Sequence, residues 1–238
     1  MGAAFLWGLL GSSSLVLGAL LVIVRPIATR TLGLVMGFGA GVLISAVSFE
    51  LVEEAVKVSD DQGGVALGMF GGTLVYFLGD RYLERREGGN GGESGAAIGI
   101  VLGTVLDGIP ESAVLGLTLL ETGTIGVAML VAVFVSNLPE SISASSDLLE
   151  SGWARGRVLR LWTVVALASA GAAAAGYGLL DGASNRTVAF VQAFAGGAIL
   201  CMLTSTMVPE SYERAGRAVG LTATLGFAVA FFISLAEG

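Results

Sequence analysis

Two short motifs of similar sequence lie near the middle of the chain, Asp-Gly-Ile-Pro-Glu-Ser at 107–112 and Ser-Asn-Leu-Pro-Glu-Ser at 136–141. Each falls within a long apolar run. A charged carboxylate at the centre of a bilayer costs roughly 2.5–3.5 kcal/mol on insertion scales, so it requires a partner. Each proline also frees a carbonyl four positions earlier, at Leu106 or Val135. Carboxylates beside freed carbonyls predict an oxygen-lined site that suits a cation.

The spacing of the polar residues predicts which of them meet. Asp107 and Glu111 are four residues apart, as are Ser136 and Glu140, so each pair lies on one helix face. Asp107 and Asn137 lie equally far from the turn between the helices and should meet at one depth. Straight helices would leave Glu111 and Glu140 about 10 Å apart along the axis. The predicted metal ligands are Asp107, Glu111, Ser136, Asn137 and Glu140. The alternative is two protonated carboxylates that are hydrogen-bonded to neighbouring Ser and Asn side chains.

The composition indicates a membrane protein with several helices. The 238 residues are 54% hydrophobic and 13% charged, whereas a soluble domain carries about 25% charge. Glycines four residues apart, such as Gly37 and Gly41, form seams that bring helices close together, and one seam is a candidate homodimer contact. The chain has no histidine and no basic patch of nucleic-acid-binding size. We therefore expect no Ser-His or HExxH chemistry, no enzymatic activity and no nucleic-acid partner.

The hydropathy pattern predicts how the chain crosses the lipid bilayer. Eight apolar segments have spanning length. They lie at about 4–24, 32–55, 64–83, 95–119, 124–147, 158–180, 188–208 and 218–236. Ten of the twelve Lys and Arg residues fall in alternate loops, so the positive-inside rule puts those loops in the cytoplasm and both termini outside. We predict one all-α membrane domain over 1–238, in a plasma membrane of prokaryotic type.

An internal repeat relates the second and seventh segments at an offset of 156 residues. Phe38-Gly-Ala-Gly-Val-Leu-Ile resembles Phe194-Ala-Gly-Gly-Ala-Ile-Leu, and Glu54 matches Glu210. The two helices should run in opposite directions, as in the inverted repeats of many transporters, unless small-residue helices merely look alike by chance. The predicted parts are two repeats and a central helix pair, at about 4–83, 158–236 and 95–147.

Acidic residues near the helix ends extend the predicted cation path. Glu50 and Glu54 lie toward the outer end of the second segment, where they could collect cations as an entrance. Asp147 and Glu210 lie at the cytoplasmic end and could form an exit, although ordinary interfacial charge is the favoured interpretation there. The same alternative of solvated helix-end acids applies to the entrance.

The sequence resembles the ZIP family of divalent metal transporters along essentially its whole length. In that family the fourth helix typically reads His-Asn-x-Pro-Glu-Gly and the fifth His-Glu-x-Pro-Glu-Gly, which correspond here to 107–112 and 136–141. The seventh segment ends in Pro209-Glu210, like the family's terminal Pro-Glu. The resemblance implies a 3+2+3 ZIP-like bundle. It also implies metal uptake toward the cytoplasm through an elevator-like or rocking motion of the inner helices.

The departures from the family pattern predict a changed metal preference. Asp107 and Ser136 replace the two histidines, and Asn137 replaces an acidic residue. The remaining ligands are all oxygens, which favour harder ions such as manganese or magnesium over zinc. We expect a transporter of manganese, magnesium, iron or zinc, with a reduced preference for zinc and with the metal ion and the lipid bilayer as partners. The alternative is a ZIP-fold protein that has lost ordinary metal transport and serves as a sensor, scaffold or carrier of another solute.

Overall fold

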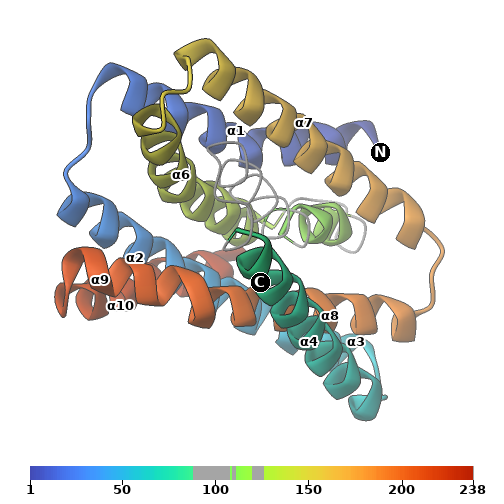
Figure 1. Ribbon diagram of the computed structural model, residues 1–238. Coiled ribbons are helices and arrows are strands. Elements are labelled where there is room, and N and C mark those ends of the chain that lie inside the picture. Colours follow the sequence, from blue (N-terminus) through green and yellow to red (C-terminus); the bar gives the residue numbers. More distant parts are fainter. Residues whose placement is uncertain (88–107, 109–110, 120–125, 238) are drawn as a thin grey trace.

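The computed structural model describes residues 1–87, 108, 111–119 and 126–237. Within this part of the chain every regular element is helical, as predicted (Figure 1). The elements are α1 (Gly2–Val24), α2 (Thr29–Ala46), η1 (Val47–Glu53), α3 (Glu54–Val58), α4 (Gln62–Glu87), α6 (Val127–Glu150), α7 (Arg155–Leu180), α8 (Asn185–Met202), η2 (Leu203–Met207), α9 (Val208–Ala215) and α10 (Ala218–Glu237). Residues 111–119 are also helical.

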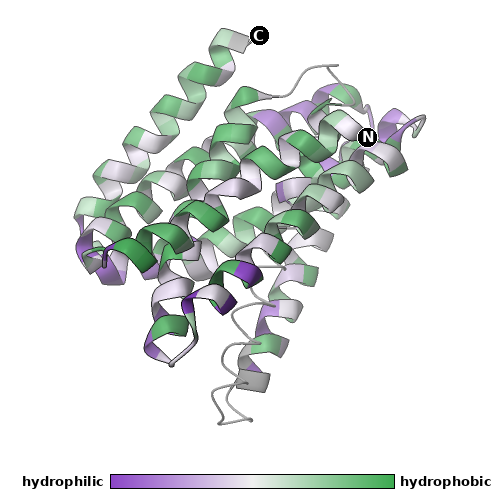
Figure 2. Ribbon diagram, turned by 90° about the horizontal axis from the view of Figure 1, so that it is seen from above, coloured by the Kyte–Doolittle hydropathy of each residue, from purple (hydrophilic) through white to green (hydrophobic). Residues whose placement is uncertain are grey.

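Six helices of the described part are long and apolar enough to cross a membrane. They cover Gly2–Val24, Thr29–Val58, Val127–Glu150, Arg155–Leu180, Asn185–Ala215 and Ala218–Ala236. Hydrophobic residues predominate along these helices (Figure 2), and the chain is a helical membrane protein. Of the other two predicted spans, the segment 64–83 is helical within α4 but is not among the six. Most of the segment 95–119 lies outside the described residues, so eight spans with outward termini stay a prediction.

The two longest spans each contain a short π-helical stretch. α2, η1 and α3 form one continuous helix, and so do α8, η2 and α9. The hydroxyl of Ser48 donates to the carbonyl of Ile44 at 2.7 Å, and that of Thr204 donates to Leu200 at 2.9 Å. Such back-bonding to the previous turn competes with the regular helix pattern. Each of these hydroxyls belongs to the second residue of a π-helical stretch, which widens the helix locally without ending it.

The bounds of these two helices match at the offset of the sequence repeat. α2 and α8 are both 18 residues long, and α8 begins 156 residues after α2. η2 also begins 156 residues after η1, and the two hydroxyl residues of the π-helical stretches differ by the same number. The chain therefore builds the same local backbone twice from two distant segments.

α2 packs against α10 through backbone contacts that only glycine allows. A Cβ added at Gly41 would collide with the carbonyl of Ala223. A Cβ added at Gly226 would collide in the same way with the carbonyl of Phe38. Small residues let the two helix backbones touch, which is how helices associate tightly in lipid.

α4 packs against α8 through the same kind of contact. Gly197 lies against the carbonyl of Met69, and Gly72 lies against that of Phe194. Gly197 follows Gly41 by 156 positions, and Phe194 follows Phe38 by the same number. The α2–α10 and α4–α8 pairs are thus built from matching residues of the two halves of the chain.

The α2–α10 and α4–α8 pairs, with the continuations of α2 and α8, contact each other and form the first group of helices. A second group comprises α1, α6, α7 and the segment 111–119. Gly18 of α1 allows a close approach to Ser141 and to the carbonyl of Leu138 in α6. Between α1 and α7, the hydroxyl of Ser12 donates to the carbonyl of Ala166 at 3.1 Å. Hydrophobic residues from α1, α6 and α7 complete this unit, and the largest buried ones are Leu15, Leu148 and Trp162. α2 and α6 form the main contact between the two groups (Figure 1).

Candidate metal centre and the charged helix ends

A proline and a glycine shape the point where α2 crosses α6. Pro139 lies inside α6 and cannot donate the usual hydrogen bond to the carbonyl of Val135. α2 passes this carbonyl at Gly39, where an added Cβ would lie 3.3 Å from Val135 O and 3.4 Å from Ser136 Cα. Glycine therefore lets α2 approach the freed carbonyl. The proline in the motif at 136–141 predicted this carbonyl, whereas the role of Gly39 was not predicted, and the sequence repeat around Phe38 was its only signal.

The structure brings two of the predicted ligands into direct contact. The hydroxyl of Ser136 donates to Glu111 Oε2 at 3.4 Å and to the carbonyl of Val133 at 3.1 Å. Glu111 is 1% exposed and Ser136 is 0% exposed. A carboxylate at this depth needs hydrogen bonds or a cation to offset its desolvation. The contact fits both predicted alternatives, an oxygen-lined metal centre and a protonated carboxylate hydrogen-bonded to serine.

The remaining predicted ligands lie on α6 or outside the described residues. Asn137 is buried and Glu140 is half-buried, one and four positions after Ser136. Asp107 falls outside the described residues. Within the part of the chain that the structure describes, no three His, Cys, Asp or Glu side chains gather as metal ligands. The five-residue set, which includes Asp107, stays a prediction.

The acids of the predicted entrance take separate partners. Glu50, in η1, accepts a hydrogen bond from the hydroxyl of Ser234 in α10 at 2.5 Å. Lys57 forms ion pairs with Glu53 at 2.9 Å and Glu54 at 3.9 Å. These three side chains are 41–59% exposed, so solvent screens their attraction. Glu50 is therefore tied into the bundle, whereas Glu54 behaves as a solvated acid at a helix end.

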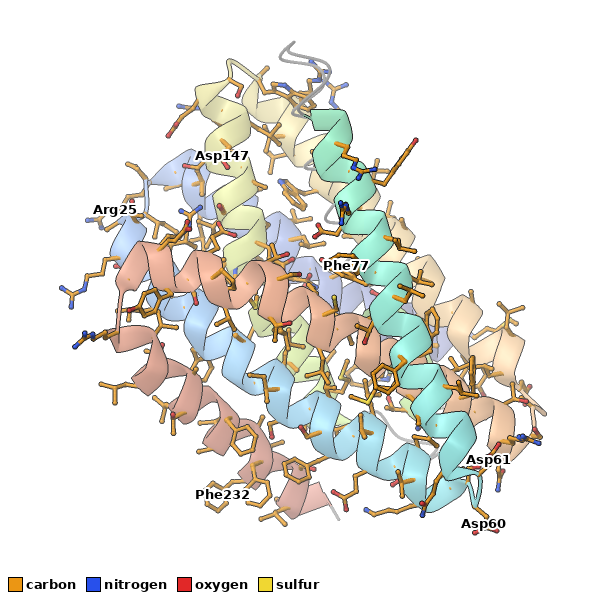
Figure 3. The ribbon with its side chains drawn as sticks, turned by 60° about the horizontal axis from the view of Figure 1, so that its bottom comes forward. Arg25, Asp60, Asp61, Phe77, Asp147 and Phe232 are labelled. Carbon is orange, nitrogen blue, oxygen red and sulfur yellow. The ribbon has the colours of Figure 1, made fainter. Side chains whose placement is uncertain are left out.

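The acids of the predicted exit lie at the opposite end of the molecule. Figure 3 shows Asp147 near Arg25, far from Asp60 and Asp61. Asp147 is exposed, whereas Glu210 is joined to Arg214 at 2.6 Å. Arg214 was not predicted as a partner of Glu210, although their spacing of four residues on one helix was a usable signal.

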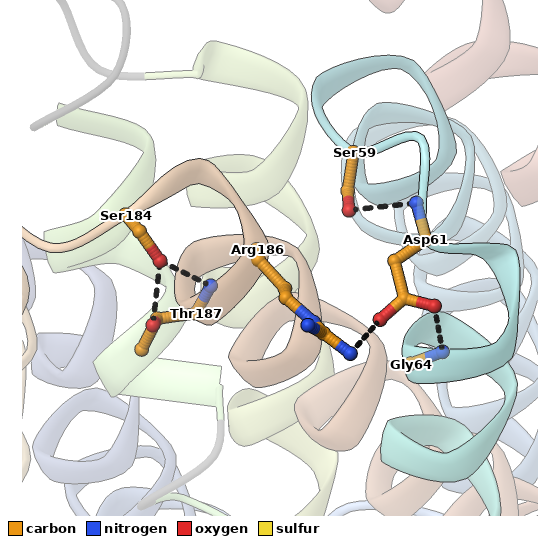
Figure 4. A network of polar contacts seen from close by, with 6 residues as sticks. All are labelled: Ser59, Asp61, Gly64, Ser184, Arg186 and Thr187. Atoms are coloured by element: carbon orange, nitrogen blue, oxygen red, sulfur yellow. Dashed lines mark hydrogen bonds and ion pairs between the residues drawn. The ribbon is translucent and has the colours of Figure 1, made fainter.

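A second charged network ties the turn after α3 to the start of α8 (Figure 4). Asp61 Oδ2 pairs with the guanidinium of Arg186 at 2.7 Å, and Oδ1 accepts from the amide of Gly64 at 3.0 Å. The Ser184 side chain caps α8 by accepting from the amide of Thr187 at 3.3 Å. The turn and α8 are thus held together at the predicted outer end, a link that the sequence analysis did not identify.

No model of a known protein family matches the sequence, and no curated protein matches it. The fold defines the class of protein, an all-helical membrane protein with at least six spans among the described residues. The resemblance to ZIP transporters depends on the paired Pro-Glu motifs and the repeat.

Proposed function

We propose that this protein is a ZIP-like transporter that moves divalent cations across the membrane toward the cytoplasm. The observation that matters most is the buried carboxylate of Glu111 in contact with Ser136, one turn before Pro139 in α6. Intramembrane acids are costly, and they commonly mark ion pathways. The carbonyl of Val135, one residue before Ser136 on α6, is a further oxygen that Pro139 leaves without its helical donor.

The matched elements support the predicted pair of repeats around a central helix pair. Transporters built from inverted repeats bind their substrate near the midplane, where interrupted helices expose backbone oxygens. Here α2 and α8 have the same length and the same π-helical continuation. Between them in the sequence lies α6, with its internal proline.

The two helix groups support a motion of one group against the other. Glycine contacts hold α2 to α10 and α4 to α8, so these pairs should move as units. α6 belongs to the other group and carries Ser136, Asn137 and Glu140. A displacement along the α2–α6 contact would move these three residues toward one side of the membrane or the other, as an elevator-like or rocking mechanism requires.

The proposed substrate is a hard divalent ion. Carboxylate, hydroxyl, amide and carbonyl oxygens suit manganese and magnesium, whereas zinc and iron gain more from imidazole and thiolate ligands. The set Asp107, Glu111, Ser136, Asn137 and Glu140 contains oxygen ligands without either of those groups. Reduced preference for zinc follows from this chemistry.

The experiment measures manganese uptake into proteoliposomes and manganese binding to the purified protein. We expect a Glu111→Gln, Glu140→Gln double variant to lose both, because the two changes remove the central negative charge while keeping the side-chain size. Asp181→Asn is the matched control, since Asp181 is an exposed acid in a loop. Unchanged metal binding in the double variant would reject the proposed site and favour the alternative, a ZIP-fold protein without ordinary transport. Tight zinc-selective uptake would reject the preference for hard ions.

A further inference from the structure

Arg214 lies at the centre of a closed polar ring between α9 and α6. Its Nη2 donates to Glu210 Oε1 at 2.6 Å and to the hydroxyl of Ser143 at 2.6 Å, and its Nε donates to Glu210 Oε1 at 3.0 Å. The hydroxyl of Ser143 donates in turn to Glu210 Oε1 at 3.1 Å. One arginine therefore joins a carboxylate on its own helix to a hydroxyl on a different helix.

The ring is only partly accessible. Ser143 is 8% exposed, and the side chains of Arg214 and Glu210 are 24% and 33% exposed. Charge-assisted hydrogen bonds are stronger than neutral ones, and partial burial reduces their screening by salt. The ring is thus a firmer link than an ordinary surface ion pair.

The ring joins the two helix groups. α9 is seated on α2, where a Cβ added at Gly33 would lie 2.7 Å from Arg214 Cβ and 2.9 Å from the carbonyl of Ser211. Ser143 belongs to α6, in the other group. At Gly39 the same two groups meet through small residues and backbone, so sliding there breaks no ion pair. Relative motion of the groups must break the bond between Arg214 and Ser143.

We propose that Arg214 is a latch that holds α6 to α9 and keeps the predicted cytoplasmic mouth closed. This proposal rests on the proposed function, because it assigns a gate to the same cation path. Glu210 is one of the predicted exit acids, and its carboxylate is already paired with the guanidinium of Arg214. Asp147, four residues after Ser143 on α6, lies within electrostatic range of Arg214 and Glu210. A divalent cation that arrives there repels the guanidinium and competes for the carboxylates, so the departing ion itself opens the latch.

The test measures the separation of α6 and α9 by pulsed electron resonance in proteoliposomes. Spin labels are attached to cysteines at the exposed positions Glu150 and Glu213 in a Cys201→Ser background. We expect one dominant distance in the parent protein and a second, longer distance on addition of magnesium. Arg214→Gln should raise the ratio of the longer to the shorter distance at least about tenfold without magnesium, the effect expected from losing one charge-assisted hydrogen bond.

Two variants separate a latch from general loosening of the fold. Arg214→Lys keeps a cation that reaches Glu210 and should restore most of the short distance. Arg217→Gln removes an exposed arginine three residues further along and should change nothing. Manganese uptake is measured on the same vesicles, where Arg214→Gln should raise the maximal rate about threefold and leave the half-saturating concentration within about twofold.

The outcomes distinguish the two proposals. Suppose that the parent protein takes up manganese but that the α6–α9 distance distribution is the same in the parent protein, Arg214→Gln and Arg214→Lys. The latch is then wrong and transport stands. If uptake is absent but magnesium and Arg214→Gln both shift the distance, the latch stands and the transport proposal fails. If Arg214→Gln fails to insert or fold, Ser143→Ala is the second variant, and an unchanged distance distribution in it overturns the latch.

Discussion

The helices α2–η1–α3 and α8–η2–α9 have nearly the same backbone but different charges. In both, an 18-residue α-helix continues into a π-helical stretch that contains a back-bonded hydroxyl. The first then presents Glu50, Glu53 and Glu54, whereas the second presents the exposed hydroxyls of Thr204 and Ser205 before its ion pair. The same small residues and a back-bonded hydroxyl thus accompany the same backbone geometry in both helices, whereas the other side chains make the two ends of the molecule chemically different.

The two repeats differ most clearly in packing at a position where one has a glycine and the other does not. Gly39 of α2 matches Ala195 of α8 at the offset of 156. Gly39 lies against the carbonyl of Val135 in α6. Ala195 has a Cβ and is buried all the same. The first repeat thus packs more closely at this position, where it meets the proline-containing helix α6.

The largest effect is expected where the repeats should behave alike. Gly41→Ala and Gly197→Ala each put a methyl group into a facing carbonyl, of Ala223 or of Met69. Overpacking of this kind costs about 1–3 kcal/mol, and a backbone obstacle puts both variants at the upper end of that range. Unfolding in mixed detergent micelles measures the loss.

Gly171→Ala is the matched control for these two variants. Gly171 is exposed on α7 and has no atom within 4 Å of an added Cβ. There the change should be neutral or gain up to about 1 kcal/mol from helix propensity. If Gly41→Ala were severe and Gly197→Ala harmless, the two helix pairs would not be structurally equivalent.

A smaller effect of about 1 kcal/mol is expected for Gly39→Ala, where the repeats differ. The added Cβ would lie 3.3 Å from Val135 O, so the neighbouring backbone must move only a few tenths of an ångström. The same variant should lower manganese uptake more than stability predicts, because the α2–α6 contact must slide. Ala195→Gly is the reciprocal change and should cost about 0.5–1 kcal/mol through helix entropy, with uptake unchanged. Normal uptake in Gly39→Ala would show that this contact does not limit the motion.

Hydropathy predicted the positions of the long apolar helices well, because it measures the length of an apolar run. The segments predicted at about 4–24 and 158–180 are helices at Gly2–Val24 and Arg155–Leu180. The π-helical stretches were not predicted, because a hydroxyl that bonds to the preceding turn does not by itself mark one: Ser48 and Thr204 form this bond, and so does Thr163 within the regular helix α7.

The candidate site was predictable only in part. The repeated Pro-Glu motif predicted Glu111 and Ser136 as members of one ligand set, but equal distance from the turn paired Asp107 with Asn137, so the direct contact between Glu111 and Ser136 was not predicted. Arg214 could be assigned to Glu210 from their spacing. Its bond to Ser143, which lies 71 residues away, depends on how α9 is seated on α2, and only the folded structure reveals that.

A third prediction concerns the hydroxyls of the π-helical stretches. Ser48→Ala removes the bond to the carbonyl of Ile44 and should cost about 0.5–1 kcal/mol of unfolding free energy. Thr163→Val is the control, because the Thr163 hydroxyl bonds to the carbonyl of Leu159 within the regular helix α7. In a regular helix such a bond adds little, so this change should be nearly neutral. Equal costs for the two variants would mean that the hydroxyl does not stabilise the π-helical stretch.

The smallest effect is expected at the ion pairs that follow the first π-helical stretch. Lys57 and Glu53 are 59% and 46% exposed, whereas Arg214 and Glu210 at the other end are 24% and 33% exposed. Lys57→Gln should leave the unfolding free energy unchanged within error, because water and salt already screen this pair. The control is Arg214→Gln, which should destabilise measurably and more at low salt than at high salt. Lys57→Gln and Arg214→Gln could instead lose the same salt-dependent amount of unfolding free energy. That result would contradict the proposal that the Arg214 pair fixes helix positions more strongly than the exposed Lys57 pair.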